Sequence, residues 1–137
     1  MWTQYHNDSA KKFASDNGIN VVPGKGGQGL GDDFVYHGSN SGHQALNLAY
    51  VLSIREGYIP AIYMLGYDMG ATGRKHWFGD HPAKLHNGEH KNFVGNFNGI
   101  ASRFKELGIR CVNLTRETLL TQFERSTIDD WDFHSVK

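Results

Sequence analysis

Residues 34–52 read FVYHGSNSGHQALNLAYVL and join a predicted strand to a predicted helix. The first three residues are aromatic or β-branched, as is typical of a strand. Small residues follow, among which Ser39, Asn40 and Ser41 all suit the N-cap of a helix. Apolar side chains then recur at helical spacing: Ala45, Leu46, Leu48, Ala49, Tyr50 and Leu52. The segment therefore predicts a strand, a tight turn and an amphipathic helix.

The same patterns continue on both sides of this segment. Strands are predicted at residues 19–22, 34–37, 59–65 and 109–114, and helices at residues 2–17, 43–56, 89–107 and 115–123. Strands separated by amphipathic helices predict right-handed crossovers and a parallel sheet. We therefore expect an α/β fold of three layers with a mostly parallel sheet of about four strands. One domain is expected over residues 1–125, followed by a polar tail over residues 126–137.

Charge and composition exclude several classes of protein. The 137 residues carry 14 Lys and Arg against 14 Asp and Glu, so the net charge is zero. This balance argues against nucleic-acid binding through bulk charge and against a polybasic membrane anchor. No apolar run approaches the ~20 residues of a membrane span, and residues 1–8 do not resemble a signal peptide. A cytoplasmic location is expected, and the single Cys111 is interpreted as a packing residue.

Candidate binding residues follow the predicted strands, because ligands of parallel sheets bind beyond the carboxyl ends of the strands. The first group precedes the helix in the quoted segment, where free backbone N–H groups and the helix dipole favour an anion. Ligand contact and simple helix capping both explain this composition. The group comprises Ser39, Asn40, Ser41, Gly42 and His43.

Three further features allow both a functional and an ordinary structural role. Residues 24–29 match G-x-G-x-x-G, but a strand rather than a helix is predicted next, which favours a flexible loop. Asp68 follows the most apolar strand, where it would hold a ribose hydroxyl, a metal-bound water or a turn. Arg116 follows the last strand and would either clamp a phosphate or cap a neighbouring loop.

The densest group of chemically capable side chains lies in residues 74–82, RKHWFGDHP. Cations here suit phosphates and aromatic rings suit a flat base, which predicts a lid over a bound ligand. The alternative is a loop folded over an aromatic plug. The histidine spacing matches no familiar zinc pattern, so no metal site is predicted. The candidate ligand-binding residues of this loop are Arg74, Lys75, His76, Trp77, Phe78, Asp80 and His81.

Four segments carry a resemblance to a known family: residues 38–49 (GSNSGHQALNLA), 65–69 (LGYDM), 76–82 (HWFGDHP) and 112–118 (VNLTRET). They resemble a group of small tailed-phage proteins with a Rossmann-like fold, which are similar to the MptE-like hydroxymethylpterin diphosphokinases. The helix start and the Gly-x-Asp strand end are more distantly similar to those of bacterial sialyltransferases. The resemblance implies a small Rossmann-like three-layer fold that lacks an N-terminal strand and nucleotide loop before the helix at residues 2–17.

Two functions are consistent with this resemblance. The first is a phage-encoded protein that binds a phosphorylated, nucleotide-like small molecule in the host cytoplasm and sequesters a host anti-phage signal. The second is an MptE-like diphosphotransferase or a glycosyl-group transferase, which would use Mg²⁺ with Asp68 and Asp80 as the candidate ligands. No catalytic residue is assigned. A homo-oligomer is expected, because a sheet of few strands leaves edges to cover.

Overall fold

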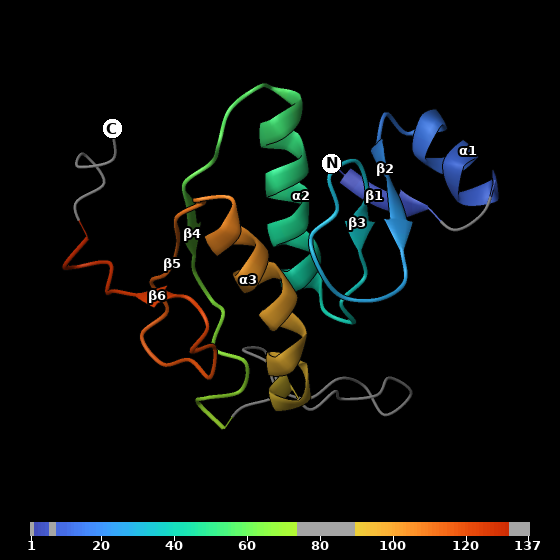
Figure 1. Cartoon of the computed structure of the whole chain (residues 1–137). Coiled ribbons are helices and arrows are strands. Elements are labelled where there is room, and N and C mark those ends of the chain that lie inside the picture. Colours follow the sequence, from blue (N-terminus) through green and yellow to red (C-terminus); the bar gives the residue numbers. More distant parts are fainter. Residues whose placement is uncertain (1, 6–7, 74–89, 132–137) are drawn as a thin grey trace. The chain divides into compact units, whose positions relative to one another are not determined.

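The computed structural model describes residues 2–5, 8–73 and 90–131 (Figure 1). The chain divides into two compact units, Met1–Pro60 and Ala61–Lys137, and each unit is described here by itself. The single domain expected over residues 1–125 stays a prediction.

The first unit contains a sheet of three parallel strands and two helices (Figure 1). Its strands lie in the order β1-β2-β3, and Trp2 pairs with Asn20 at the start of the first ladder. Gly24 and Lys25 pair with the two residues of β3. The elements are β1 (Trp2–Tyr5), α1 (Asp8–Asp16), β2 (Asn20–Lys25), β3 (Val35–Tyr36) and α2 (Ser41–Arg55).

The start of the chain corrects one sequence prediction. A helix was expected over residues 2–17, but residues 2–5 form strand β1 and the helix begins only at Asp8. The helical spacing that suggested the longer helix included Phe13, whose side chain is 64 % exposed, whereas Ala14 is fully buried. Trp, Thr and Tyr favour strands, and β2 supplies the hydrogen-bonding partner that β1 needs. A strand therefore precedes α1, where the resemblance implied none.

Helix α2 buries a face that overlaps the predicted stripe in part. Leu46 and Tyr50 of that stripe are buried as expected, Ala45 is exposed, and Val51 joins the core. The buried positions recur at three and four residues and include three polar side chains: His43, Leu46, Asn47, Tyr50, Val51 and Ser53. The prediction missed the polar members of this face because polar side chains add nothing to an apolar periodicity.

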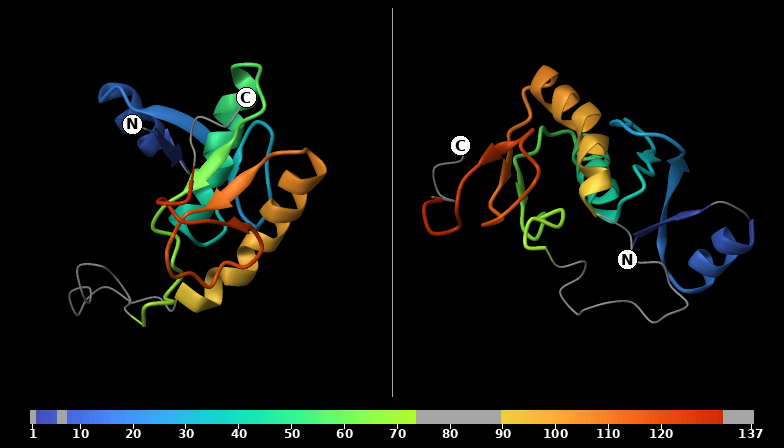
Figure 2. Two further views of the ribbon diagram at one scale, coloured as in Figure 1. Left: turned by 90° about the vertical axis from the view of Figure 1, so that its left-hand side faces the viewer. Right: turned by 90° about the horizontal axis from the view of Figure 1, so that it is seen from below.

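The second unit has its own sheet of three parallel strands, in the order β4-β5-β6. Figure 2 shows β4 and β5 side by side, as their pairing from Ile62↔Cys111 to Met64↔Asn113 requires. Phe97, Ile100 and Phe104 are buried with Met64 and Val112 in its core. The elements are β4 (Ile62–Met64), the 3₁₀ helix η1 (His90–Phe97), α3 (Asn98–Glu106), β5 (Cys111–Asn113) and β6 (Glu124–Arg125).

Two predictions in this unit need correction. The single helix expected over residues 89–107 is instead a 3₁₀ helix followed by an α-helix. The short helix expected over residues 115–123 does not form. Asn113 and Thr118 accept hydrogen bonds from the backbone N–H groups of Thr115 and Leu120, and strand β6 follows. The start of the polar tail is also packed: the ring of Trp131 lies 5.3 Å from that of Tyr63.

The structure confirms a mixed α/β fold with parallel strands. The described strands lie in two small sheets, so the single four-stranded Rossmann-like sheet is not confirmed. Among the described residues there is no helix with the length and apolar character needed to cross a membrane.

Candidate functional site

The connection between β3 and α2 is a tight turn with an unusual backbone. Gly38 and Ser39 have φ values of +54° and +53°, in the left-handed region. The N–H of Asn40 donates to the carbonyl of His37 across the turn, at 3.4 Å. Two successive residues with positive φ are the feature of a type I′ turn, and only glycine adopts that backbone without strain. Ser39 is therefore a strained residue at the entrance to α2.

One of the three predicted N-cap residues caps α2. The Oδ1 atom of Asn40 accepts a hydrogen bond from the N–H of His43 at 3.2 Å. Ser39 and Ser41 are exposed on either side of this cap, and Gly42 is half-buried. The first turn of α2 contains no acidic residue, so no carboxylate of that turn offsets the positive end of the helix dipole.

His43 lies inside the unit, with its side chain fully buried. Its Nε2 accepts a long hydrogen bond from the N–H of Gly29, at 3.5 Å. A Cβ atom on Gly38 would lie 2.2 Å from the imidazole ring, so only glycine fits beside it. Burial lowers the pKa of His43 below its usual 6.5, and a hydrogen bond with the Tyr36 backbone partly offsets this. The imidazole therefore packs the turn against the glycine-rich loop.

Asn47, one helical turn after His43, is the residue that sequence reasoning missed. Its Oδ1 accepts from the N–H of Tyr36 at 2.9 Å and from that of Gly31 at 3.2 Å. Its Nδ2 donates to the carbonyl of Gly31 at 3.0 Å. This fully buried amide thus fastens both the loop and strand β3 to α2. In the sequence, the only indication that Asn47 shares a helix face with His43 is their i,i+4 spacing.

These contacts bring the carboxyl ends of β2 and β3 to the first turn of α2. The N–H of Gly38 donates to the carbonyl of Gly27 at 2.9 Å, which closes the glycine-rich loop onto the turn. The prediction that residues 24–29 lack the context of a dinucleotide fingerprint is confirmed, since no helix follows them before Ser41. Lys25 ends β2, and its Nζ lies 3.7 Å from the centre of the Phe34 ring. We name residues 25–31 together with 37–43 the α2 turn site.

The second unit places Asp68 in a turn. Its Oδ2 accepts from the N–H of Gly70 at 3.0 Å, and its carbonyl accepts from the N–H groups of Ala71 and Leu119. Of the three roles considered for Asp68, the described contacts are those of a turn-capping carboxylate.

Thr118 joins the loops that follow β4 and β5. Its hydroxyl donates to the carbonyl of Tyr67 and accepts from Nδ2 of Asn113 and from the N–H of Leu120. Thr115 adds a second link, because its Oγ1 accepts from the N–H of Tyr67 at 2.9 Å. The segment VNLTRET therefore holds the two strand ends together through its own polar side chains.

Arg116 lies in this loop with its side chain 82 % exposed and 4.0 Å from a carboxylate oxygen of Asp129. Its carbonyl accepts from the guanidinium of Arg125 at 3.0 Å. An exposed guanidinium remains accessible to a phosphate, so the phosphate-clamp role stays a prediction. Seven further predicted binding residues lie outside the described residues: Arg74, Lys75, His76, Trp77, Phe78, Asp80 and His81.

No cluster of three or more His, Cys, Asp or Glu side chains suited to a metal ion occurs in the described part of the chain. Comparison with protein-family models, curated proteins and solved structures gave no match. The resemblance to small phage proteins stays a prediction. The functional proposal rests on the geometry of the α2 turn site.

Proposed function

We propose that this protein binds a phosphorylated, nucleotide-like small molecule and that the α2 turn site receives a phosphate group. The observation that carries the proposal is the meeting of two parallel strand ends with the first turn of a 15-residue helix. Backbone N–H groups at such a position, together with the helix dipole, favour an anion. The glycine-rich loop beside them lets a ligand approach the backbone closely.

The side chains at this site suit the same ligand. Ser39 and Ser41 expose hydroxyl groups beside the helix start, and Lys25 is an exposed cation at the end of β2. The buried His43 and Asn47 hold the loop and the turn in place without occupying that surface. In the proposed arrangement, exposed polar side chains contact the phosphate, and the buried His43 and Asn47 hold the loop and the turn in place.

The biological role that we propose rests on the resemblance to small tailed-phage proteins. A phage protein of a Rossmann-like α/β fold, acting in the host cytoplasm without catalysis, would sequester a host nucleotide signal of anti-phage defence. The alternative proposal is an MptE-like or glycosyl-group transferase with Mg²⁺ as cofactor. Asp68, already engaged in a turn, is its described candidate ligand for that ion.

Calorimetry with ATP, a cyclic dinucleotide, adenosine and inorganic pyrophosphate tests the proposal. We expect the phosphorylated probes to bind and adenosine to bind far more weakly. Ser41→Glu places a carboxylate at the exposed first turn and should weaken binding roughly five- to tenfold, since like charges ~4 Å apart repel by about 1 kcal/mol or more. The same change should leave stability equal or higher, because acidic groups suit a helix N-terminus.

Ala45→Glu is the matched control, because it adds the same charge on an exposed position of the same helix, beyond its first turn. It should leave affinity close to that of the wild type. If both variants weakened binding equally, or if no phosphorylated probe bound, the proposal of a phosphate site at the start of α2 would be wrong. Conversion of ATP to a product in the presence of Mg²⁺ would favour the transferase over the binding protein.

A further inference from the structure

Two Asn-Gly pairs occur among the described residues, and their surroundings differ. Asn17-Gly18 follows the last turn of α1, and Asn98-Gly99 begins α3. A third pair, residues 87–88, lies outside the described residues. Asn-Gly pairs are chemically labile, because glycine has no side chain to hinder attack by its own backbone nitrogen on the preceding amide.

The Asn17-Gly18 pair is open to water. Asn17 is exposed, Gly18 has a φ of +62°, and a Cβ built on Gly18 would meet no atom within 4 Å. The N–H of Gly18 donates to the carbonyl of Ser15 over a long 3.3 Å. This bond closes the last turn of a nine-residue helix, and helix ends fray readily.

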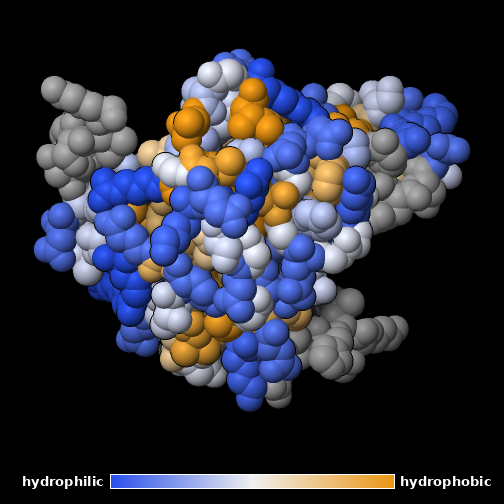
Figure 3. Space-filling view, viewed as in Figure 1, coloured by the Kyte–Doolittle hydropathy of each residue, from blue (hydrophilic) through white to orange (hydrophobic). Residues whose placement is uncertain are grey.

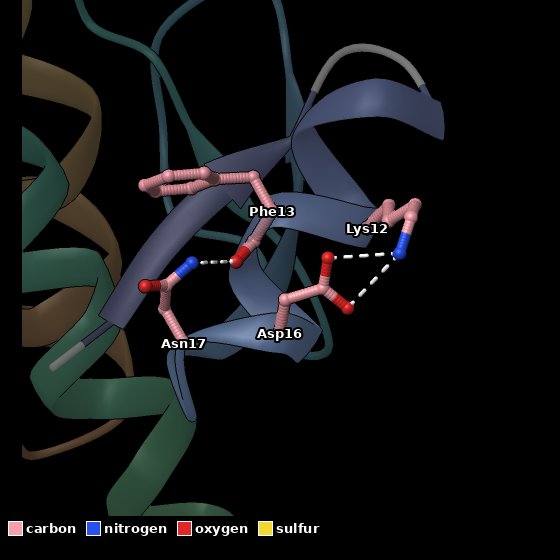
Figure 4. A network of polar contacts seen from close by, with 4 residues as sticks. All are labelled: Lys12, Phe13, Asp16 and Asn17. Carbon is pink, nitrogen blue, oxygen red and sulfur yellow. Dashed lines mark hydrogen bonds and ion pairs between the residues drawn. The ribbon is translucent and has the colours of Figure 1, made fainter.

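The side chain of Asn17 is held by one described bond to its own helix. Its Nδ2 donates to the carbonyl of Phe13 at 2.8 Å (Figure 4). Both carboxylate oxygens of the neighbouring Asp16 are engaged by Nζ of Lys12, at 2.8 and 3.1 Å, so this carboxylate is directed to the lysine in the same view. Opening the last turn of α1 releases the amide of Asn17 and the N–H of Gly18 together.

We propose that Asn17 is a site of spontaneous deamidation in the folded protein. The Gly18 nitrogen, after loss of its proton to hydroxide, forms a bond to Cγ of Asn17, and the Cγ–Nδ2 bond breaks with release of ammonia. Water then opens the resulting succinimide at either carbonyl, giving an aspartyl or an isoaspartyl residue. The net change is the replacement of an amide by a carboxyl group, with consumption of one water molecule.

Asn98 provides the internal comparison. It lies in the first turn of α3, where helical backbone angles hold the next nitrogen away from Cγ. Its Oδ1 also accepts a hydrogen bond from Nε2 of Gln122 at 2.8 Å, which ties the side chain to a distant segment. Both asparagines are exposed, so a difference between their deamidation rates would reflect this geometry and not solvent access alone.

Conversion of Asn17 would alter the end of α1. The donor to the Phe13 carbonyl would be replaced by a carboxylate oxygen, and a new negative charge would stand at a helix C-terminus, where it is unfavourable. An isoaspartyl linkage would in addition lengthen the backbone between α1 and β2, whose ladder with β1 begins at Asn20. The modified protein should therefore unfold more easily.

The test is incubation of the folded full-length chain in mildly alkaline and in mildly acidic buffer, followed by peptide mapping and enzymatic labelling of isoaspartyl groups. We expect the Asn17 peptide to convert faster than the Asn98 peptide, and faster in the alkaline buffer, where the attacking nitrogen loses its proton. Asn17→Gln should suppress conversion in that peptide, and Asn17→Asp should reproduce the stability of the aspartyl product. Conversion of Asn98 at an equal or higher rate, or conversion of Asn17 only after unfolding in urea, would overturn the proposal.

Discussion

The turn before α2 requires a glycine at position 38, where the buried ring of His43 packs. Gly38 has a left-handed backbone, and its missing Cβ leaves room for the buried imidazole. Either requirement alone would favour glycine, and together they exclude every other residue. The glycine of this turn is thus explained by packing, whether or not a ligand is bound.

Gly38→Ala should lower the free energy of unfolding by about 2–5 kcal/mol, because a left-handed alanine costs ~1–2 kcal/mol and forced overpacking a further ~1–3. Gly57→Ala is the control, since Gly57 has a φ of +81° with open space around its Cβ direction. It should show the backbone penalty alone. Urea unfolding of both variants measures the difference, and equal losses would refute the contact between residue 38 and the imidazole.

Cys111 is a buried thiol of the second unit. It lies in β5 and is 7 % exposed, and burial raises the pKa of its thiol to about 12 from 9.0. At neutral pH the thiolate population is then about a thousandfold smaller than in the unfolded chain. We expect a thiol reagent to modify the folded chain far more slowly than the urea-unfolded chain. Similar rates in the two states would contradict the buried placement.

At the scale of the element, α2 organises the first unit through polar side chains. Its buried face combines the polar side chains of His43, Asn47 and Ser53 with the apolar side chains of Leu46, Tyr50 and Val51. Hydrogen bonds from side chains of this helix therefore hold the glycine-rich loop against α2. The loop after β5 is also held by hydrogen bonds of polar side chains, those of Asn113 and Thr118.

Asn47→Ala should destabilise the protein by about 3–5 kcal/mol, because it leaves two N–H groups and one carbonyl of the loop and β3 without their partner. Gln44→Ala, which removes one part-buried bond to the His37 carbonyl, should cost about 1 kcal/mol. Hydrogen exchange adds a local readout: the amides of Gly31 and Tyr36 should lose protection. Unchanged exchange at both amides would show that Asn47 does not hold the loop.

At the scale of the whole molecule, stability should depend on pH through His43. Its pKa is lowered in the folded state, so the unfolded chain binds a proton first as the pH falls below 6.5. Stability is therefore fully present above 6.5 and declines below it, until the folded state also takes up a proton. The lowered pKa of the Glu124 carboxyl, caused by Arg110, acts in a separate window below 4.5.

The measurement is the urea midpoint as a function of pH for the wild type and for His43→Gln. The variant should be less stable at neutral pH and should show a shallower decline just below 6.5. An unchanged slope in the variant would mean that other groups cause the pH dependence.

Self-association remains a prediction, and the described surface motivates it. Among the described strands, β1 pairs with β2 alone, and several large apolar side chains are exposed. Apolar residues also appear among polar ones on the face in Figure 3. Light scattering over a range of concentrations should show a mass above that of one chain, and a constant monomer mass would contradict it. The exposed residues are Phe13, Tyr58, Ile59, Leu65, Leu119 and Ile128.

The sequence by itself determined the elements whose signals are local. The start of α2 after small capping residues and the helix stops at Gly18 and Gly108 follow from nearest-neighbour preferences. Asn40 as a cap and the loop character of residues 26–29 were predictable for the same reason, whereas Gly24 and Lys25, also expected in the loop, belong to β2. These features need no knowledge of what packs against them.

Only the tertiary structure decided the features that depend on distant partners. Residues 2–5 are a strand because β2 lies beside them. Residues 115–123 are not helical because the hydroxyl groups of Thr115 and Thr118 bind the backbone of Tyr67, about 50 residues earlier in the chain. His43 and Asn47 look like candidates for ligand contact or for the solvent face, yet both are buried. Backbone groups of the loop and of β3 bind both polar atoms of the Asn47 amide, and the N–H of Gly29 donates to Nε2 of His43. A buried polar side chain is stable only with such partners, and its partners are brought to it by the fold.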